Sequence, residues 1–105
     1  MEEVLKNLTN ENFHNEIKSG ITVVDFWAPW CGPCRMIAPL VEELDEEMSD
    51  INFAKLNVDE AQDIAVQFGV MSIPTIIFFK DGEQKDSVVG VVPKDKITSI
   101  IEAIQ

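Results

Sequence analysis

The chain holds two cysteines, Cys31 and Cys34, separated by two residues. The apolar run at 21–27 predicts a buried strand before the pair, and residues 34–48 have the apolar spacing of a helix. A cysteine at a helix N-terminus meets unpaired backbone N–H groups and the positive end of the helix dipole, which favour the thiolate over the thiol. Cys31 is therefore the candidate nucleophile.

Cys34 follows one helical turn later on the same face, where it can close a short disulfide with Cys31. In a reducing compartment such a pair indicates redox or metal chemistry rather than a structural crosslink. A structural zinc site normally needs four Cys or His ligands, and His14 is the only histidine of the chain. We expect no metal site, and we expect His14 to lie on the surface because it falls outside the apolar stripe of its predicted helix.

Two charged residues interrupt apolar strands, namely Asp25 within 21–27 and Lys55 within 51–58. Burying an unpaired carboxylate is costly, so Asp25 indicates a functional group behind the cysteine pair. A strand, a helix and a second strand of these lengths predict a right-handed parallel crossover, which makes the two strands neighbours. Pairing of Asp25 with Lys55 would then account for both charges. Burial should raise the pKa of Asp25, and Lys55 should oppose that shift.

The other elements follow from capping residues, apolar spacing and turn signals. The apolar pattern of the 34–48 helix continues across Pro39, so we expect a kink there rather than an end. The remaining predictions are a strand at 4–8, a helix capped by Thr9-Asn10-Glu11 and stopped by Gly20, a helix from Asp59 to Phe68 stopped by Gly69, strands at 76–80 and 84–91 joined by an Asp81-Gly82 turn, and a last helix opened by Pro93.

The segment Trp30-Cys31-Gly32-Pro33-Cys34, preceded by Val24-Asp25-Phe26-Trp27-Ala28, resembles the active-site segment of the thioredoxin family. Four further segments resemble landmarks of that family and occur in the expected order, namely Met36-Ile37-Ala38-Pro39, Lys55-Leu56-Asn57-Val58-Asp59, Ile73-Pro74-Thr75 and Lys80-Asp81-Gly82. The likeness implies a single domain over residues 1–105 with an α/β thioredoxin fold, a central five-stranded mixed sheet flanked by four helices. The order of strands in the sheet and a cis Ile73-Pro74 bond rest on this resemblance.

The leading functional hypothesis is a thiol–disulfide oxidoreductase that reduces protein disulfides. Thiolate Cys31 attacks a client disulfide, Cys34 resolves the mixed disulfide, and Asp25, linked to Lys55, accepts the proton of Cys34. The resemblance also implies a substrate-binding surface of Trp30, Gly32, Pro33, Ile73, Pro74 and Gly90. It implies no bound cofactor, and electrons that come from NADPH through a separate flavoprotein, thioredoxin reductase.

Composition narrows the set of partners and compartments. The formal net charge of −11 disfavours nucleic acid and anionic lipid, and no apolar run approaches the ~20 residues that span a bilayer. The N-terminal residues lack the basic start and apolar centre of a signal peptide. We therefore expect a cytoplasmic monomer that meets client proteins and a reductase.

Two alternatives stay open. The same chemistry could run in the opposite direction, in a disulfide-forming oxidase or isomerase, although Gly32-Pro33 resembles the reductant branch of the family. The fold could also bind a partner without thiol chemistry, as an additional role. Small departures from the common family pattern, at Pro29, at Arg35 and in the lack of tyrosine, leave the choice of client open.

Overall fold

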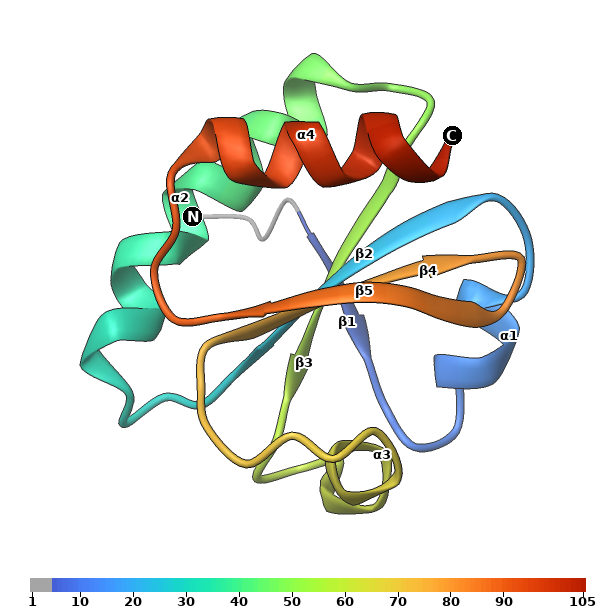
Figure 1. The fold of residues 1–105 in the computed structure, drawn as a ribbon. Helices are drawn as coiled ribbons and strands as arrows, with labels where there is room; N and C mark the ends of the chain where they lie inside the picture. Colours follow the sequence, from blue (N-terminus) through green and yellow to red (C-terminus); the bar gives the residue numbers. More distant parts are fainter. Residues whose placement is uncertain (1–4) are drawn as a thin grey trace.

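The computed structural model of the protein describes residues 5–105, and in this part of the chain five strands form one sheet with four helices around it (Figure 1). The strands are β1 (Lys6–Leu8), β2 (Ile21–Trp27), β3 (Asn52–Asn57), β4 (Thr75–Lys80) and β5 (Glu83–Val89). The helices are α1 (Phe13–Ile17), α2 (Gly32–Glu47), α3 (Gln62–Gln67) and α4 (Lys94–Ile104). The predicted α/β architecture with a mixed sheet is confirmed.

The strand order is β1-β3-β2-β4-β5, with β1, β3 and β2 parallel and β4 and β5 antiparallel to their neighbours. β2 lies in the centre, and its residues are buried except for the half-buried Trp27 at its end. A strand covered on both faces is expected to be apolar throughout rather than alternating, as this one is. The carboxyl end of β2 leads directly to the cysteine pair.

The helices form a layer on each face of the sheet (Figure 1). α2 and α4 pack on one face, where Ile37 and Leu44 share a buried cluster with Val23, Phe78 and Ile101. α1 and α3 cover the other face, in a second cluster with its own buried apolar residues. Burying a large apolar side chain contributes roughly 1.5–3 kcal/mol, so these clusters hold both helix layers against the sheet.

Three phenylalanines form the aromatic part of the second cluster. The ring of Phe13 in α1 lies 5.3 Å from that of Phe68 and 5.5 Å from that of Phe79, while Phe68 and Phe79 are 5.2 Å apart. Centroid separations of about 4.5–7 Å with tilted or edge-to-face rings are those that aromatic pairs prefer. This contact fixes the end of α3, and with it the loop that leads to Ile73-Pro74.

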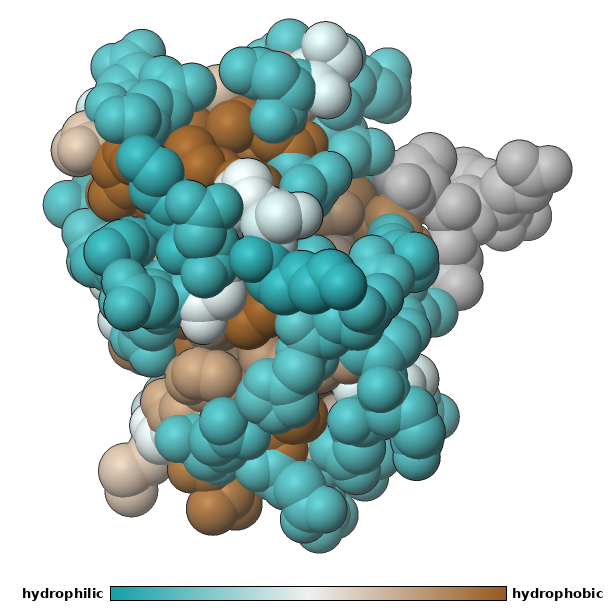
Figure 2. Space-filling model, turned by 90° about the vertical axis from the view of Figure 1, so that its right-hand side faces the viewer, coloured by the Kyte–Doolittle hydropathy of each residue, from teal (hydrophilic) through white to brown (hydrophobic). Residues whose placement is uncertain are grey.

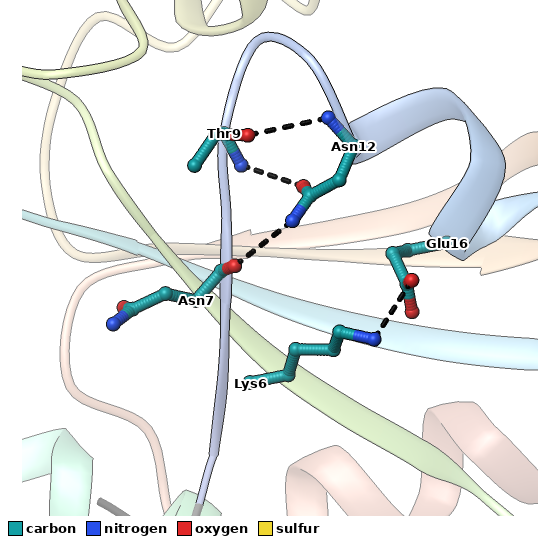
Figure 3. A network of polar contacts seen from close by, with 5 residues as sticks. All are labelled: Lys6, Asn7, Thr9, Asn12 and Glu16. Carbon is teal, nitrogen blue, oxygen red and sulfur yellow. Dashed lines mark hydrogen bonds and ion pairs between the residues drawn. The ribbon is translucent and has the colours of Figure 1, made fainter.

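The turn before α1 is closed by its own side chains (Figure 3). The backbone N–H of Thr9 donates to Asn12 Oδ1 at 2.7 Å, and the N–H of Asn12 donates to Thr9 Oγ1 at 3.2 Å. The ion pair between Lys6 and Glu16, at 2.8 Å, ties β1 to α1. Thr9 therefore closes the turn before α1, but the helix itself begins at Phe13 with Asn12 as its N-cap residue, so the predicted cap at Thr9-Asn10-Glu11 lies too early in the chain.

Several predicted boundaries are corrected. β1 begins at Lys6, and the Val4 end of the predicted strand lies outside the described residues. α2 begins at Gly32 instead of Cys34 because Pro33 fits the first turn of a helix, where a missing N–H costs nothing; the helix then continues through Pro39. α3 begins at Gln62, so Asp59 does not cap it.

The β4–β5 turn is built as the Asp81-Gly82 pair predicts, with φ of +50° and +88° at these two residues. The carboxylate of Asp81 accepts the N–H of Gly20 at 2.9 Å, and the N–H of Asp81 donates to the Gly20 carbonyl at 2.9 Å. β5 ends at Val89, two residues earlier than predicted, because Gly90 leaves the extended conformation at φ +92°.

The surface that carries α1 and the β4–β5 turn is mostly hydrophilic, with smaller apolar areas between the polar side chains (Figure 2). This is the side of the molecule turned away from the loop that holds the cysteine pair. Among the described residues, no helix combines the length and the apolar character that crossing a membrane requires.

Candidate active site

Cys31 and Cys34 are joined in a disulfide at the start of α2, with their Cα atoms 5.3 Å apart. Cys31 is the N-cap residue of the helix, with an extended backbone, and the backbone N–H of Cys34 donates to Cys31 Sγ at 3.2 Å. A serine or aspartate oxygen occupies the same place at many helix N-termini. The cap geometry therefore directs an N–H group and the positive helix end at the Cys31 sulfur, which favours its thiolate form.

Asp25 lies in β2 and is only 2% exposed. Its register partner on the parallel neighbour β3 is Lys55, so the predicted burial and strand pairing are both confirmed. Burial raises the pKa of Asp25 from 3.8 to about 7, although the charge of Lys55 opposes the shift. Within the described residues, Asp25 Oδ1 has no hydrogen-bond partner. The carboxyl group thus titrates near neutral pH and keeps a free oxygen.

Asp25 and Cys34 line the same cavity, which has a volume of about 120 Å³. Lys55 also lines this cavity, and its ammonium group lies 5.2 Å from the centre of the Trp27 ring. Cys34 and Glu42 line the cavity two helical turns apart on one face of α2. The second cysteine and the buried aspartate therefore share one cavity.

Trp30 stands on the surface beside the disulfide with 69% of its area exposed. Its indole Nε1–H donates to Asp59 Oδ2 at 2.9 Å. Sequence reasoning assigned Asp59 to a helix cap and missed this role. The available signal was its position after β3, since parallel neighbours end at the same edge of a sheet and bring Asp59 next to the residues that follow β2.

The Ile73-Pro74 bond is cis, as the family resemblance implied. The carbonyl oxygen of Ile73 lies 3.8 Å from Cys31 Sγ, and the Ile73 side chain packs against the two cysteines. The N–H of Gly90 donates to the Pro74 carbonyl at 2.8 Å, and the φ of +92° at this position is a backbone conformation that glycine adopts without strain. The loops that carry Ile73, Pro74 and Gly90 are thereby held together beside Cys31.

Gly32 and Pro33 form the exposed first residues of α2 between the cysteines. His14 lies exposed on α1, where its ring contacts the edge of Phe13 at 5.3 Å. No group of three or more histidine, cysteine, aspartate or glutamate side chains within residues 5–105 has the arrangement of a metal site.

A strand-to-helix cysteine pair, capped at its first sulfur and backed by a buried carboxyl group, defines the class of thiol–disulfide oxidoreductases. The family model described as Thioredoxin matches residues 4–103. Thioredoxin of Staphylococcus saprophyticus is 53% identical over 96 residues, which cover 90% of this chain and 92% of that protein. Thioredoxin of Bacillus subtilis is 49% identical over 94 residues, covering 89% of this chain and 90% of that protein.

The solved structure of mitochondrial thioredoxin 3 from Saccharomyces cerevisiae, in its oxidized form, matches with a TM-score of 0.86 and 36% identity. The match covers 93% of this chain and 94% of that one. The chain therefore belongs to the thioredoxin family, whose members are protein-disulfide oxidoreductases that act by dithiol–disulfide exchange.

Proposed function

We propose that this chain reduces disulfides of client proteins with Cys31 as the nucleophile and Cys34 as the resolving thiol. The cap hydrogen bond from the Cys34 N–H to Cys31 Sγ carries the assignment, because it favours negative charge on the first sulfur alone. The Cys31 thiolate attacks one client sulfur, forms a mixed disulfide and releases the other client sulfur as a thiol. Cys34 then attacks Cys31, which releases the first client sulfur. Two electrons pass to the client, and the protein keeps the Cys31–Cys34 disulfide.

Asp25 accepts the proton that Cys34 must lose before it attacks. The shared cavity, the unpartnered carboxylate oxygen and the pKa of about 7 support this role. A general base works best when its pKa lies near the working pH. Lys55, the register partner of Asp25, limits the upward shift of that pKa and keeps a useful fraction of the carboxyl group ionised.

The client binds in an extended conformation across a shallow client groove, which we define as Trp30, Gly32, Pro33, Ile73, Pro74 and Gly90. Support comes from the exposed indole of Trp30 and from the position of the Ile73 carbonyl beside Cys31. An extended segment placed there can form backbone hydrogen bonds, as peptides do when they add to the edge of a sheet.

Each client reduction leaves the cysteine pair oxidised, so a continuing cycle needs a donor of two electrons. The donor in this proposal is the flavoprotein thioredoxin reductase, which takes its electrons from NADPH. The chain itself acts as a monomer without a bound cofactor, in the cytoplasm. Membership of the thioredoxin family, and the Gly32-Pro33 pair that resembles its reductant branch, support these assignments.

The test compares Cys34→Ser with Cys31→Ser on a disulfide-bonded client protein. Cys34→Ser should accumulate a mixed disulfide through Cys31, since the resolving thiol is gone, whereas Cys31→Ser should trap little. Mass spectrometry after alkylation measures both. Equal trapping by the two variants would contradict the assignment of roles. Turnover with dithiothreitol alone, and then with thioredoxin reductase and NADPH, tests the electron source.

A further inference from the structure

The largest exposed apolar side chains near the client groove are not all part of it. Met71 is 95% exposed and Val89 is 62% exposed, although neither belongs to the groove as defined above. Such exposure does nothing for the stability of the fold, and clustered apolar side chains on a surface commonly mark interaction sites. These two residues come from different segments, the loop after α3 and the end of β5.

Met71 and Val89 line one pocket of about 200 Å³. Its further walls include Phe68 and Val70 from the end of α3 and its loop, and Ile77 from β4. Pockets for complete small molecules measure about 300–1,000 Å³. The pocket between Met71 and Val89 is therefore of a size for one apolar side chain rather than for a cofactor.

The pocket adjoins the client groove. Ser72 and Thr75 both line it, and they flank the Ile73-Pro74 pair in the chain. Thr75 is also the cross-strand partner of Val89. Because the Ile73 carbonyl lies 3.8 Å from Cys31 Sγ, the pocket begins within a few residues' reach of the attacking sulfur.

We propose that this pocket is a specificity subsite, which receives an apolar side chain located two residues from the client's disulfide-forming cysteine. The inference rests on the proposed client groove and extends it. An extended client advances about 3.3 Å per residue, with alternate side chains on the same side. The nearest client side chain on the side of its cysteine is therefore the one two residues away, and in this proposal that side chain enters the pocket between Met71 and Val89, which adjoins Ile73.

The experiment uses short peptides with one cysteine held in a mixed disulfide with 2-mercaptoethanol. The peptides differ only in carrying Leu or Ser two residues before or two residues after the cysteine. The expected result is a kcat/KM about tenfold higher for Leu on one of the two sides, equivalent to about 1.4 kcal/mol. Peptides with Leu next to the cysteine should show no such preference, because adjacent side chains point to opposite sides.

The double variant Met71→Ser/Val89→Ser should reduce the Leu-to-Ser ratio to less than twofold. Met71→Gln alone should reduce it severalfold, and folding is not at risk because this side chain lies almost entirely in solvent. The matched control is Val66→Ser on α3, which is 79% exposed but does not line the pocket; its ratio should stay near tenfold.

Three results would overturn the subsite: no Leu preference in the parent protein, an unchanged ratio in both Met71 variants, or an equal loss in Val66→Ser. Hydroxyethyl disulfide is too small to reach the pocket. Its reduction by the parent protein therefore distinguishes a failure of the subsite from a failure of the proposed function. If the parent protein reduces hydroxyethyl disulfide without discriminating between the peptides, the subsite alone is wrong. If it reduces neither the peptides nor a disulfide-bonded client protein in the presence of dithiothreitol, the proposed function is wrong and the subsite with it.

Discussion

Asp25 couples the chemistry of the cysteine pair to the stability of the fold. In the unfolded chain this carboxyl group ionises near pH 3.8, whereas burial raises its pKa in the folded state to about 7. Between these values the folded state holds a proton that the unfolded state has lost, so rising pH favours unfolding relative to a neutral residue. Below pH 3.8 the two states are equally protonated at this position, and the penalty vanishes.

We predict that Asp25→Asn raises the free energy of unfolding by up to roughly 4 kcal/mol at pH 8, because one pKa unit corresponds to about 1.4 kcal/mol. The gain should shrink steadily as the pH falls from 7 towards 4. Urea unfolding of parent and variant across this range measures it. Resolution of the mixed disulfide should slow in the same variant, as a single-turnover assay can show.

The control for this prediction is Lys55→Gln, which removes the charge that lowers the pKa of Asp25. The pH above which ionisation of Asp25 lowers the free energy of unfolding no further should then move above 7. A variant Asp25→Asn that is less stable than the parent at pH 8, or that resolves the mixed disulfide as fast, would show that Asp25 is structural.

The Trp30–Asp59 hydrogen bond orients an exposed side chain beside Cys31. We predict that Asp59→Ala frees the indole ring, so its fluorescence anisotropy falls in a Trp27→Phe background. A hydrogen bond to a charged acceptor contributes about 1.5–3 kcal/mol when shielded from water, and less at an exposed site. We expect kcat/KM for protein clients to fall about threefold. Asp59→Asn keeps an acceptor oxygen and should retain most of the anisotropy; equal losses in both variants would contradict the role of the hydrogen bond.

At the scale of elements, α2 and the β4–β5 hairpin position the site in different ways. α2 presents the cysteines in its first turn and is held by the buried Ile37 and Leu44. The turn of the hairpin lies outside the site, but its Asp81 bonds Gly20, the residue before the central strand. This contact links the turn to the strand that leads to Cys31.

We predict that Asp81→Ala lowers the free energy of unfolding by about 2–3 kcal/mol. Alanine loses the hydrogen bond to Gly20, worth about 1 kcal/mol, and is disfavoured at φ +50° by a further 1–2 kcal/mol. Asp81→Asn is the matched control, because asparagine tolerates positive φ and keeps an acceptor oxygen; it should cost less than 1 kcal/mol. Urea unfolding measures both, and an equally unstable Asn variant would point to the charge of Asp81 instead.

At the scale of the whole molecule, the formal charge of −11 acts on stability rather than on fold. Like charges on a compact surface repel one another, and salt screens them. We predict that raising NaCl from about 0.05 M to about 0.5 M increases the urea midpoint at pH 7, since the Debye length falls below about 10 Å. Replacing the exposed Glu46 and Glu60 by Gln should reduce this salt effect. A midpoint that does not change with salt would mean that self-repulsion is negligible.

Local patterns in the sequence determined most of the secondary structure. The continuous apolar run of β2, the apolar stripe of α2 and the Asp81-Gly82 turn each report the environment of their own segment. The redox chemistry could also be predicted, because the cysteine spacing and the helix start place both sulfurs within one turn. The charged residues Asp25 and Lys55 could be paired because a parallel crossover makes their strands neighbours.

Contacts between segments far apart in the chain were decided only by the tertiary structure. Asp59 has the residue type of a helix cap, yet its carboxylate accepts an indole N–H from a residue 29 positions away. The bond between Gly90 and Pro74, and the pocket between Met71 and Val89, likewise depend on which loops lie together at the edge of the sheet. Capping and periodicity are properties of neighbours in sequence, whereas these contacts depend on strand order, which the pattern of elements left open.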